Sequence, residues 1–549
     1  EDADGRWARY PPFPPAQPGG RISKVCTVRR IVLVRARLTA PSALDPRVLP
    51  GPKDARISGR EEMSSMEGVR NKSALKVLTD DQVGAIHQAS LTILEKTGVR
   101  FDSEEAIRRL IENGATRHPS RKNVLTFPRS LVEESIRKIP RYGTYHARDP
   151  RNDITFDGEH TFAHCLGGNP AMLDLETGQP RSSTLADVEQ STRVMDALEN
   201  CHSVSGLVDA TDVPARVLVI KTMEAMMKNT TKCVSGYALR TEEMDILLRM
   251  WACVAGGPEE LRKRPLFSVY GSPSSPLTYD SRVCDVMLRG AQAGIPVDVL
   301  PCPISGGTAP ITLSGGLAQQ NAELLAGAML IQTVTTRLPM EYSGRLSILD
   351  LRSGKNVWGL PEMGLASAAT VQIAHRYHMA ADVYGVTTDA NAWDLQIGLE
   401  RMMSALLPGM AGADNLSGMG GAWENAASLE MLVIDNEIYA DVFRAIRGLE
   451  VDEERLALDI IDKVGPMGNF LAQKHTMKFL RLGEVRNSPL YDKRTMDRAK
   501  MEGIRSLQET ARDVVRKILK DHAPTPLDRD VEKELTRVVK EGEKQLLSA

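Results

Sequence analysis

The 549-residue sequence has few aromatic residues, no long apolar run and little net charge. Phe, Trp and Tyr together make up 5% of it, so aromatics that gather in loops carry more information than usual. No apolar stretch approaches the roughly 20 residues that cross a bilayer, which argues against an integral membrane protein. The formal net charge is −2, so neither a nucleic-acid surface nor a charged membrane patch is indicated.

Cysteine is also scarce, and the sequence signatures of several enzyme classes are missing. The seven cysteines are odd in number and scattered, which is typical of free thiols in a reducing cytosol, so we expect a cytoplasmic protein. No CxxC or HExxH spacing indicates a metal site, and we predict none. No GxGxxG opens a helix, and no GxSxG elbow joins a strand to a helix. A nucleophilic role for Cys302 would need a basic partner, and none is indicated.

The first 62 residues differ from the rest. Stretches such as RYPPFPPAQPGGR are rich in Pro and Arg and have no helical or strand period. Such a composition cannot bury a core, so we predict that residues 1–62 are disordered. We interpret them as lying upstream of a natural start at Met63 or Met66, and a genuine flexible extension is the alternative.

Residues 75–147 carry the signals of three short helices. Thr79 and Ser103 are good N-caps, and Gly98 and Gly114 follow the two helices that these residues open. The run PRSLVEESIRKIP predicts the third helix. We expect these helices to form an N-terminal helical cap on the main domain.

From residue 148 to 423 short apolar runs alternate with helical stretches. The runs lie near residues 162, 202, 232, 265, 296, 338, 379 and 413. This alternation predicts parallel βα units, and eight of them suit the length of an α/β (β/α)₈ TIM barrel. A doubly wound open sheet is the alternative. Residues 424–549 are charged and helical in pattern, and we expect them to complete the barrel and end in a tail.

Small residues follow six of these runs directly, as in ISGGTAP and YSGRLS. In a barrel the C-terminal ends of the strands form the active face. Gly and Ser at that end would keep the opening wide enough for a bulky partner. Ordinary loop glycine explains any one of these positions, but six of them together favour a wide opening.

Aromatic residues recur at the same strand ends. A ring-lined pocket suits a quaternary ammonium ligand, because cation–π attraction needs no hydrogen-bond donor on the ligand. Rings that only pack beneath loops are the alternative, and nearby acids could balance a bound cation. The candidate pocket residues are His164, Tyr237, Tyr270, Tyr342, Tyr384, Trp393 and Trp423, with the acids Glu341 and Asp389.

Several segments together resemble the trimethylamine methyltransferase family. They include GGNPAMLDLETGQPRSSTLADV, PISGGTAPITLSGGLAQQNAELLAG and TTDANAWDLQIGLERM, in an order that runs from about residue 75 to 520. The resemblance implies a barrel that moves a methyl group from a methylated amine to the cobalt(I) of a separate corrinoid protein. It also implies no permanently bound cofactor, and we expect a homo-oligomer. The loop residues Gly306, Gly307, Thr308 and Thr312 would then face the corrinoid (cobalamin).

The resemblance also bears on the substrate. Archaeal trimethylamine enzymes of this family carry pyrrolysine, whereas this sequence has only standard residues, with Asn391 near the corresponding place. It therefore resembles the branch that uses glycine betaine and similar quaternary amines. The expected catalytic residues are Asn391, Asp389 and Glu341, and Arg345 or the backbone at Thr312 could meet a substrate carboxylate.

Two other functions remain open at this stage. A non-catalytic protein could bind or sense a quaternary amine on the same barrel. A barrel lyase or aldolase would want a lysine at a strand end, whereas Lys232 begins its strand.

Overall fold

Eight parallel strands close into a barrel in the computed structural model, which describes residues 68–423 and 425–548. The prediction for residues 1–62 lies outside the described residues. Each apolar run singled out in the sequence contains one strand, and the last strand pairs with the first, so the alternative of an open sheet is wrong. The barrel strands are β7 (His160–Cys165), β10 (Ser203–Val204), β11 (Cys233–Gly236), β12 (Phe267–Gly271), β14 (Val297–Val299), β16 (Glu341–Gly344), β19 (Ala380–Tyr384) and β20 (Asn415–Met419).

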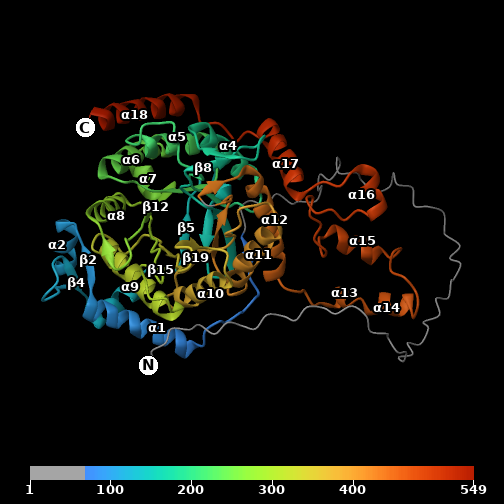
Figure 1. The fold of residues 1–549 in the computed structure, drawn as a ribbon, viewed down its shortest axis with the longest axis horizontal. Coiled ribbons are helices and arrows are strands. Elements are labelled where there is room, and N and C mark those ends of the chain that lie inside the picture. The colour runs from blue at the N-terminus through green and yellow to red at the C-terminus, as the bar shows by residue number, and fades with distance from the viewer. Residues whose placement is uncertain (1–67, 424, 549) are drawn as a thin grey trace, which may run out of the picture. The chain divides into compact units, whose positions relative to one another are not determined.

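Helices connect these strands and surround the barrel (Figure 1). Because each helix covers two neighbouring strands, its inner side is apolar and buried. The helix that follows β20 is α12, which begins beyond residue 423. The helices are α4 (Leu185–Ala197), α5 (Leu218–Asn229), α6 (Thr241–Ala255), α7 (Pro258–Lys263), α8 (Ser281–Ala293), α9 (Leu313–Gln332), α10 (Pro361–Arg376), α11 (Leu395–Met410) and α12 (Leu429–Ile446).

The N-terminal segment packs on α8, α9 and α10. Its helices are α1 (Asp80–Thr92), which Thr79 caps, α2 (Glu104–Glu112), which Ser103 caps, and α3 (Arg129–Lys138). A π-helical turn, Ile93–Thr97, extends α1. The segment also holds a small sheet that the sequence did not predict, because its strands have only two or three residues. These strands are β2 (Val99–Phe101), β3 (Thr116–Arg117), β4 (Val124–Thr126) and β13 (Thr278–Tyr279).

A two-stranded hairpin packs against the N-terminal end of the barrel. It consists of β5 (Gly143–Tyr145) and β6 (Ile154–Phe156), joined through the 3₁₀ turn Pro150–Asn152. Ile154 and Phe156 form a buried cluster with Phe162, Cys233 and Ala380, which lie at or near the starts of their strands. The short strand β1 (Val69–Arg70) pairs with β7 on the same side. The hairpin therefore covers this end of the barrel.

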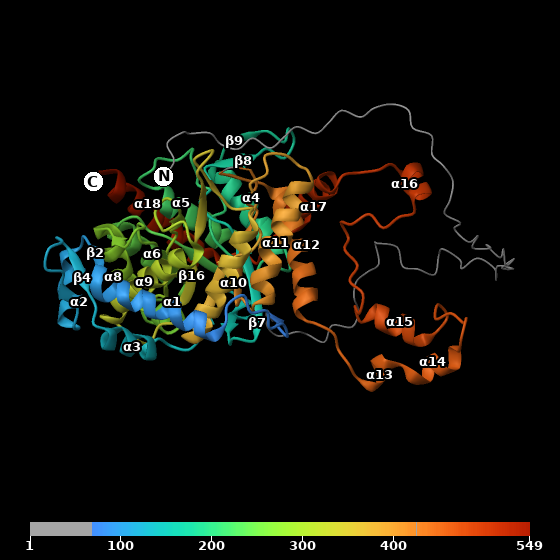
Figure 2. The ribbon, with the colours of Figure 1, turned by 60° about the horizontal axis from the view of Figure 1, so that its bottom comes forward.

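Two small sheets lie beyond the C-terminal ends of the barrel strands, an end that we call the mouth. One joins β8 (Ala171–Leu173), β9 (Pro180–Ser182) and β21 (Ala426–Ala427), and Figure 2 shows β8 and β9 at this end. The other joins β15 (Ile304–Ser305), β17 (Ser347–Asp350) and β18 (Lys355–Val357). These two sheets form part of the rim around the mouth.

Helices follow α12 in the C-terminal part. Two of its helices pack on the barrel: α17 (Leu507–Asp521) on α4 and α12, and α18 (Arg529–Ser548) on α5 and α6. We call residues 449–505 the arm, and its four short helices lie away from the barrel in both views (Figures 1 and 2). The arm contains α13 (Glu453–Leu456), α14 (Leu458–Val464), α15 (Lys474–Arg481) and α16 (Met496–Glu502). Among the described helices, none combines the length and apolar character that a membrane span requires.

Candidate active site

A cavity of about 340 Å³ opens at the mouth of the barrel. Its lining comes from the ends of several barrel strands and from α5, which contributes Thr222, Met223 and Met226. Glycines at strand ends keep it open. A Cβ on Gly236 would lie 2.9 Å from the terminal methyl of Met223, and one on Gly206 would lie 2.8 Å from the Thr222 methyl. The small residues noted in the sequence therefore make room at this end.

Five of the predicted site residues line this cavity together. They come from five different strands: His164 and Tyr270 lie near the ends of β7 and β12, Tyr384 ends β19, and Tyr237 and Arg345 directly follow β11 and β16. The sequence identified the tyrosines by their place at strand ends, and Arg345 as a possible partner of a substrate carboxylate. They are His164, Tyr237, Tyr270, Arg345 and Tyr384.

Two lining residues of this cavity, His164 and Arg345, meet at the buried Asp382 behind its wall. Its carboxylate accepts hydrogen bonds from His164 Nε2 at 3.0 Å and from Arg345 Nη2 at 2.6 Å. Burial alone would raise the pKa of Asp382, but the charges and hydrogen bonds of Arg345 and His164 lower it to about 2. The guanidinium of Arg345 also stands 4.9 Å from the centre of the Tyr384 ring. Asp382 is therefore ionised and balances Arg345.

Sequence reasoning missed Asp382, although a signal was present. It stands inside the apolar run MAADVYG, and a lone carboxylate within a buried strand needs a partner in the interior. Sequence reasoning also missed Asp209, which lines the cavity and accepts a hydrogen bond from Tyr237 Oη at 3.0 Å. Burial raises the pKa of Asp209 and this hydrogen bond opposes the rise. No pattern in the loop after β10 marks that residue.

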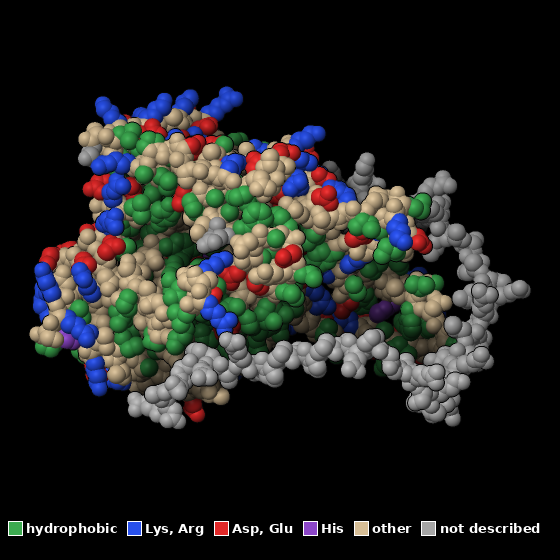
Figure 3. Space-filling model, in the orientation of Figure 1, with side chains coloured by type: hydrophobic (Ala, Val, Ile, Leu, Met, Phe, Trp, Pro, Cys, Tyr) green, Lys and Arg blue, Asp and Glu red, His purple; other side chains and the backbone are tan. Residues whose placement is uncertain are grey.

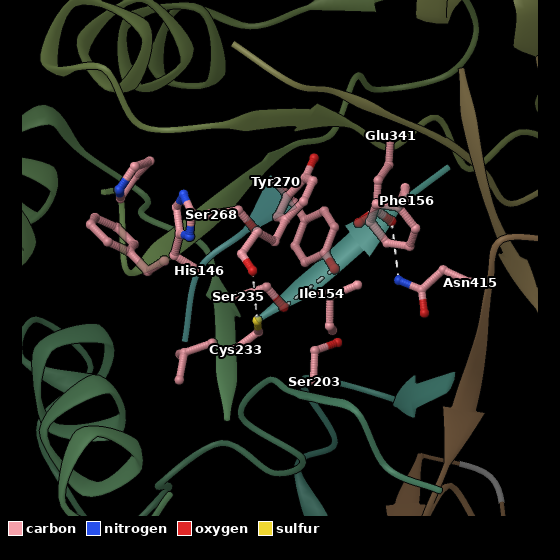
Figure 4. Close-up of a pocket in the computed structure, with 14 residues that line it drawn as sticks. His146, Ile154, Phe156, Ser203, Cys233, Ser235, Ser268, Tyr270, Glu341 and Asn415 are labelled. Carbon is pink, nitrogen blue, oxygen red and sulfur yellow. Dashed lines mark hydrogen bonds between the residues drawn. The ribbon is translucent and has the colours of Figure 1, made fainter. Parts of the chain in front are cut away.

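A second, smaller cavity lies deeper in the barrel, toward its N-terminal end (Figure 4). Its volume of about 20 Å³ is enough for one water molecule. Glu341 and Asn415 line it and join through a hydrogen bond of 3.2 Å, and Tyr270 lines both cavities. We call it the inner cavity.

The acids around the inner cavity are protonated more readily than usual. Burial, and then the charges of Asp382 and Asp298, raise the pKa of Glu341 well above its ordinary value. Burial also raises the pKa of Asp298 to about 7, and this carboxyl accepts hydrogen bonds from Tyr145 Oη at 2.6 Å and the Glu341 backbone N–H at 2.9 Å. Glu341 begins β16, so the expectation that it lies at the mouth is corrected: it lines the inner cavity.

Three other aromatic candidates lie elsewhere. Tyr342 is adjacent to Glu341 in β16 and therefore points outward, where its hydroxyl donates to Asn321 Oδ1 at 3.0 Å. Trp393 and Trp423 pack with Leu173 and its neighbours in a separate apolar cluster. None of the three lines the cavity at the mouth: Tyr342 packs between the barrel and its helices, and only the two tryptophans match the alternative of packing beneath loops.

The two loop candidates for catalysis also lie outside the cavity. Asp389 Oδ2 accepts hydrogen bonds from the backbone N–H groups of Trp358 and Gly359 at 2.8 and 2.6 Å, so it holds two loops together. Asn391 is exposed in the same loop and is not part of the cavity lining. The course of this loop, which no sequence period fixes, carries both residues away from the site.

The loop before α9 is exposed but does not line the cavity. Gly306 has φ +88°, a conformation that favours glycine, and Gly307 and Thr308 continue the turn. Thr312 is the N-cap residue of α9, without a side-chain cap bond. Their assignment to a corrinoid stays a prediction.

Other reactive groups in the barrel are held in unreactive forms. Burial raises the pKa of Cys302 to about 11, so its thiol stays protonated near neutral pH. Lys232 Nζ donates to three backbone carbonyls, those of Met195, Leu198 and Cys201, at 2.6 to 2.8 Å. A lysine tied to these carbonyls near the end of α4 is not available for Schiff-base chemistry, which removes the support for a lyase. In residues 68–423 and 425–548, no three His, Cys, Asp or Glu side chains gather as a metal site would require.

Comparison with known proteins gives consistent matches over most of the chain. The sequence profile of the trimethylamine methyltransferase family matches residues 51–546. A protein named trimethylamine methyltransferase MttB from Desulfitobacterium hafniense (strain DSM 10664 / DCB-2) is 32% identical over 467 residues, 85% of this chain and 93% of the relative. A glycine betaine methyltransferase from Desulfitobacterium hafniense (strain Y51) is 30% identical over 473 residues, which is 86% of this chain and 98% of the relative. The solved structure of the Methanosarcina barkeri monomethylamine methyltransferase MtmB covers 87% of this chain and 96% of its own, with 10% identity and a TM-score of 0.44.

Proposed function

The chain belongs to the trimethylamine methyltransferase family, and from this premise we propose that it moves a methyl group from a quaternary amine to the cobalt of a corrinoid carried by a separate protein. The observation that carries the proposal is the cavity at the mouth. It combines tyrosine rings, an acid on its wall and a buried arginine in one space.

The tyrosine rings and methionines suit a methylated ammonium group. Tyr237, Tyr270 and Tyr384 contribute rings to the wall, and Met223 and Met226 add apolar surface. A cation over a ring face gains about 0.5–2 kcal/mol, more when water is excluded. Asp209 supplies the negative charge that a permanently charged ammonium needs nearby. A quaternary nitrogen offers no N–H, so this wall of rings and methyl groups fits it well.

The other end of the ligand is proposed to carry a carboxylate. Arg345 and His164 line the cavity; Arg345 can donate hydrogen bonds to such a group, and His164 can do so through Nδ1 when its ring is protonated. Asp382 already balances the charge of Arg345, so we expect a substrate carboxylate to be held mainly by hydrogen bonds and Asp209 to attract the ammonium group. A betaine, with one ammonium and one carboxylate, meets Asp209 on one side and Arg345 or His164 on the other. The similarity to a glycine betaine methyltransferase supports the same class.

The chain's own residues would bind and orient the amine and would not attack it. When bound at the mouth, a cobalt(I) corrinoid would supply the nucleophile that takes the methyl group. The glycines of the opening support the approach of a large group. At Gly168, no heavy atom lies within 4 Å of the position that a Cβ would take. Fixing the amine with one methyl group toward the opening lowers the barrier by orientation, and the leaving amine is neutral. A cytoplasmic location is part of this proposal.

The test mixes chemically reduced cob(I)alamin with the full chain and one amine at a time, and follows the visible spectrum. The panel contains glycine betaine, carnitine, proline betaine, choline and trimethylamine, and calorimetry measures the binding of each. We expect methylcobalamin to form with a betaine and faster than with choline. Turnover with trimethylamine alone would overturn the substrate class. Tight binding of a betaine without methyl transfer would favour the binding or sensing protein instead, and neither binding nor turnover with any betaine would overturn the proposal.

A further inference from the structure

Two apolar surfaces of this chain are left uncovered, and the first is the arm. None of the residues in α13 and α14 is buried, and α15 and α16 bury one each. Large apolar side chains are exposed along its whole length, with Leu471 at 83% and Met501 at 88%, and others at Leu458, Ile461 and Leu480. Figure 3 shows hydrophobic side chains on the surface of the arm. A single exposed apolar residue would need no explanation, but the arm exposes many of them along its length.

The arm is nevertheless folded and anchored. Phe479 is buried on α15 beneath the guanidinium of Arg455, which is 5.3 Å from the ring centre. Midway along the arm the chain returns to α12, where Asp441 binds Arg486 at 2.7 Å and accepts a hydrogen bond from Tyr491 Oη at 2.5 Å. These contacts hold the apolar side chains of the arm in fixed positions away from the chain's own barrel.

The second surface is the outer side of α11. Leu395, Leu399 and Met403 follow each other at intervals of four residues, so they form one stripe along the helix. Leu395 is 83% exposed and Leu399 is 70% exposed. The opposite side of α11 packs on α10 and α12, so the helix is apolar on both its inner and outer sides. Helices of this kind are covered all round in the assembled protein.

We infer that the arm of one copy packs on the α11 stripe of a second copy, and that the second arm packs on the first copy in the same way. Both surfaces lie beside α12, from which the arm departs after Ile446 and to which it returns. A partner that covers both surfaces must itself present a protruding apolar segment and an apolar helix side. A second copy of this chain presents both, and a two-fold arrangement covers the pair twice.

A stable dimer needs a broad contact surface, and a standard interface buries about 800 Å² on each partner. Exposed Leu, Ile, Met and Phe side chains along the arm, together with the α11 stripe, offer apolar side chains to such an interface.

The methyl-carrying partner of the proposed function is a different occupant, and position argues against it. The arm leaves the side of the barrel at α12, whereas the cavity opens at the strand ends, among the loops that hold β8 and β9 (Figure 2). A protein seated on the arm and α11 would contact the side of the barrel. The inference therefore stands apart from the proposed function and has its own test.

The test is sedimentation velocity on the full chain over a range of concentrations. The first variant is L458E/I461E on the arm, the second is L395E/L399E on α11, and Gln545→Glu on exposed α18 is the matched control for added charge. We expect a dimer for the parent chain and the control, and a dimer dissociation constant raised at least 30-fold for either double variant. Circular dichroism and the midpoint of urea unfolding establish that each variant is folded.

Mixing the two double variants tests the exchange itself. In the mixed dimer one arm of unchanged sequence still meets one α11 stripe of unchanged sequence, so we expect the mixture to dimerise more tightly than either variant alone. A monomeric parent chain at all concentrations would overturn the inference. A dimer that survives both double variants, or a mixture that dimerises no better than its components, would overturn it as well.

Discussion

Arg345 donates two hydrogen bonds to Asp382 inside the barrel, one to the carboxylate and one to the backbone carbonyl, each at 2.6 Å. Both side chains are buried, and Arg345 also lines the cavity at the mouth. The pair thus places a guanidinium beside the ligand space while leaving no net charge in the interior. Most of the proposed chemistry depends on this arrangement.

Removal of one partner from this pair should destabilise the fold strongly. Asp382→Asn leaves Arg345 as a buried cation without a counter-charge, and we expect a loss of about 3–5 kcal/mol in the free energy of unfolding. Urea unfolding measures the loss. The double variant R345M/D382N removes both charges. Its loss of unfolding free energy should be smaller than the summed losses of Arg345→Met and Asp382→Asn. Additive losses would show that the two residues do not act as a pair.

The ring at position 237 should matter for binding, and its hydroxyl should matter less. Tyr237→Ala removes a ring from the cavity wall, so we expect the dissociation constant of a quaternary amine to rise about 3- to 30-fold. Tyr237→Phe keeps the ring and should bind within a few-fold of the parent chain. Tyr342→Phe is the control, since Tyr342 points away from the cavity. Calorimetry gives the three constants, and equal effects of Tyr237→Ala and Tyr342→Phe would contradict the assignment.

Asp209 should contribute through its charge. Asp209→Asn keeps the size of the side chain and an acceptor for the Tyr237 hydroxyl, but removes the negative charge that we place near the ammonium group. We expect weaker binding of betaines and choline alike, by roughly tenfold, which corresponds to about 1.4 kcal/mol. Added salt should narrow the difference between the two proteins, because it screens charge. A variant that binds choline as tightly as the parent chain does would exclude this role.

The acid pair around the inner cavity should make stability depend on pH. The pKa of Asp298 is raised by burial to about 7 in the folded chain, whereas an unfolded aspartate titrates near 4. Between these values the folded chain keeps a proton that the unfolded chain has released. The contribution of Asp298 to stability is therefore fully present below about pH 4 and is lost as the pH rises through 7. The loss is at most about 1.4 kcal/mol per pH unit for this group.

The variant Asp298→Asn tests that dependence. An amide mimics the protonated carboxyl and can still accept the hydrogen bond from Tyr145. Its free energy of unfolding should change less between pH 5 and pH 7 than that of the parent chain. An unchanged pH slope in this variant would mean that Asp298 is not the group responsible.

The barrel could be predicted from the sequence because its signals are local and repeated. Runs such as PLFSVYG are short and apolar, most are followed by a small residue, and helical stretches separate them. Closure between β20 and β7 had no signal of its own, so the open sheet stayed an alternative until the structure showed this pairing. The short strands beside α2 carried no comparable period, and their sheet gains a fourth strand, β13, from a distant loop.

The site was predictable only in part, since two physical facts were missing. One is register: Glu341 and Tyr342 are neighbours in a strand, so only one of them could face inward, and both were expected to act at the mouth. The other is the course of the loops, which places Asn391 at the surface and Trp423 in a separate cluster. Asp382 lies in β19, whereas its partners Arg345 and His164 come from the end of β16 and from β7. Their contacts could therefore be seen only in the folded barrel.

The hairpin β5–β6 that covers the N-terminal end of the barrel has a kinetic consequence. With that end covered, the amine enters and leaves through the same opening at which we propose that the methyl acceptor docks. An acceptor that docks first would shut the amine out, and one that stays after transfer would retain the product. We therefore expect compulsory-order kinetics, with the amine binding first and leaving last, and inhibition by excess acceptor that higher amine concentrations relieve.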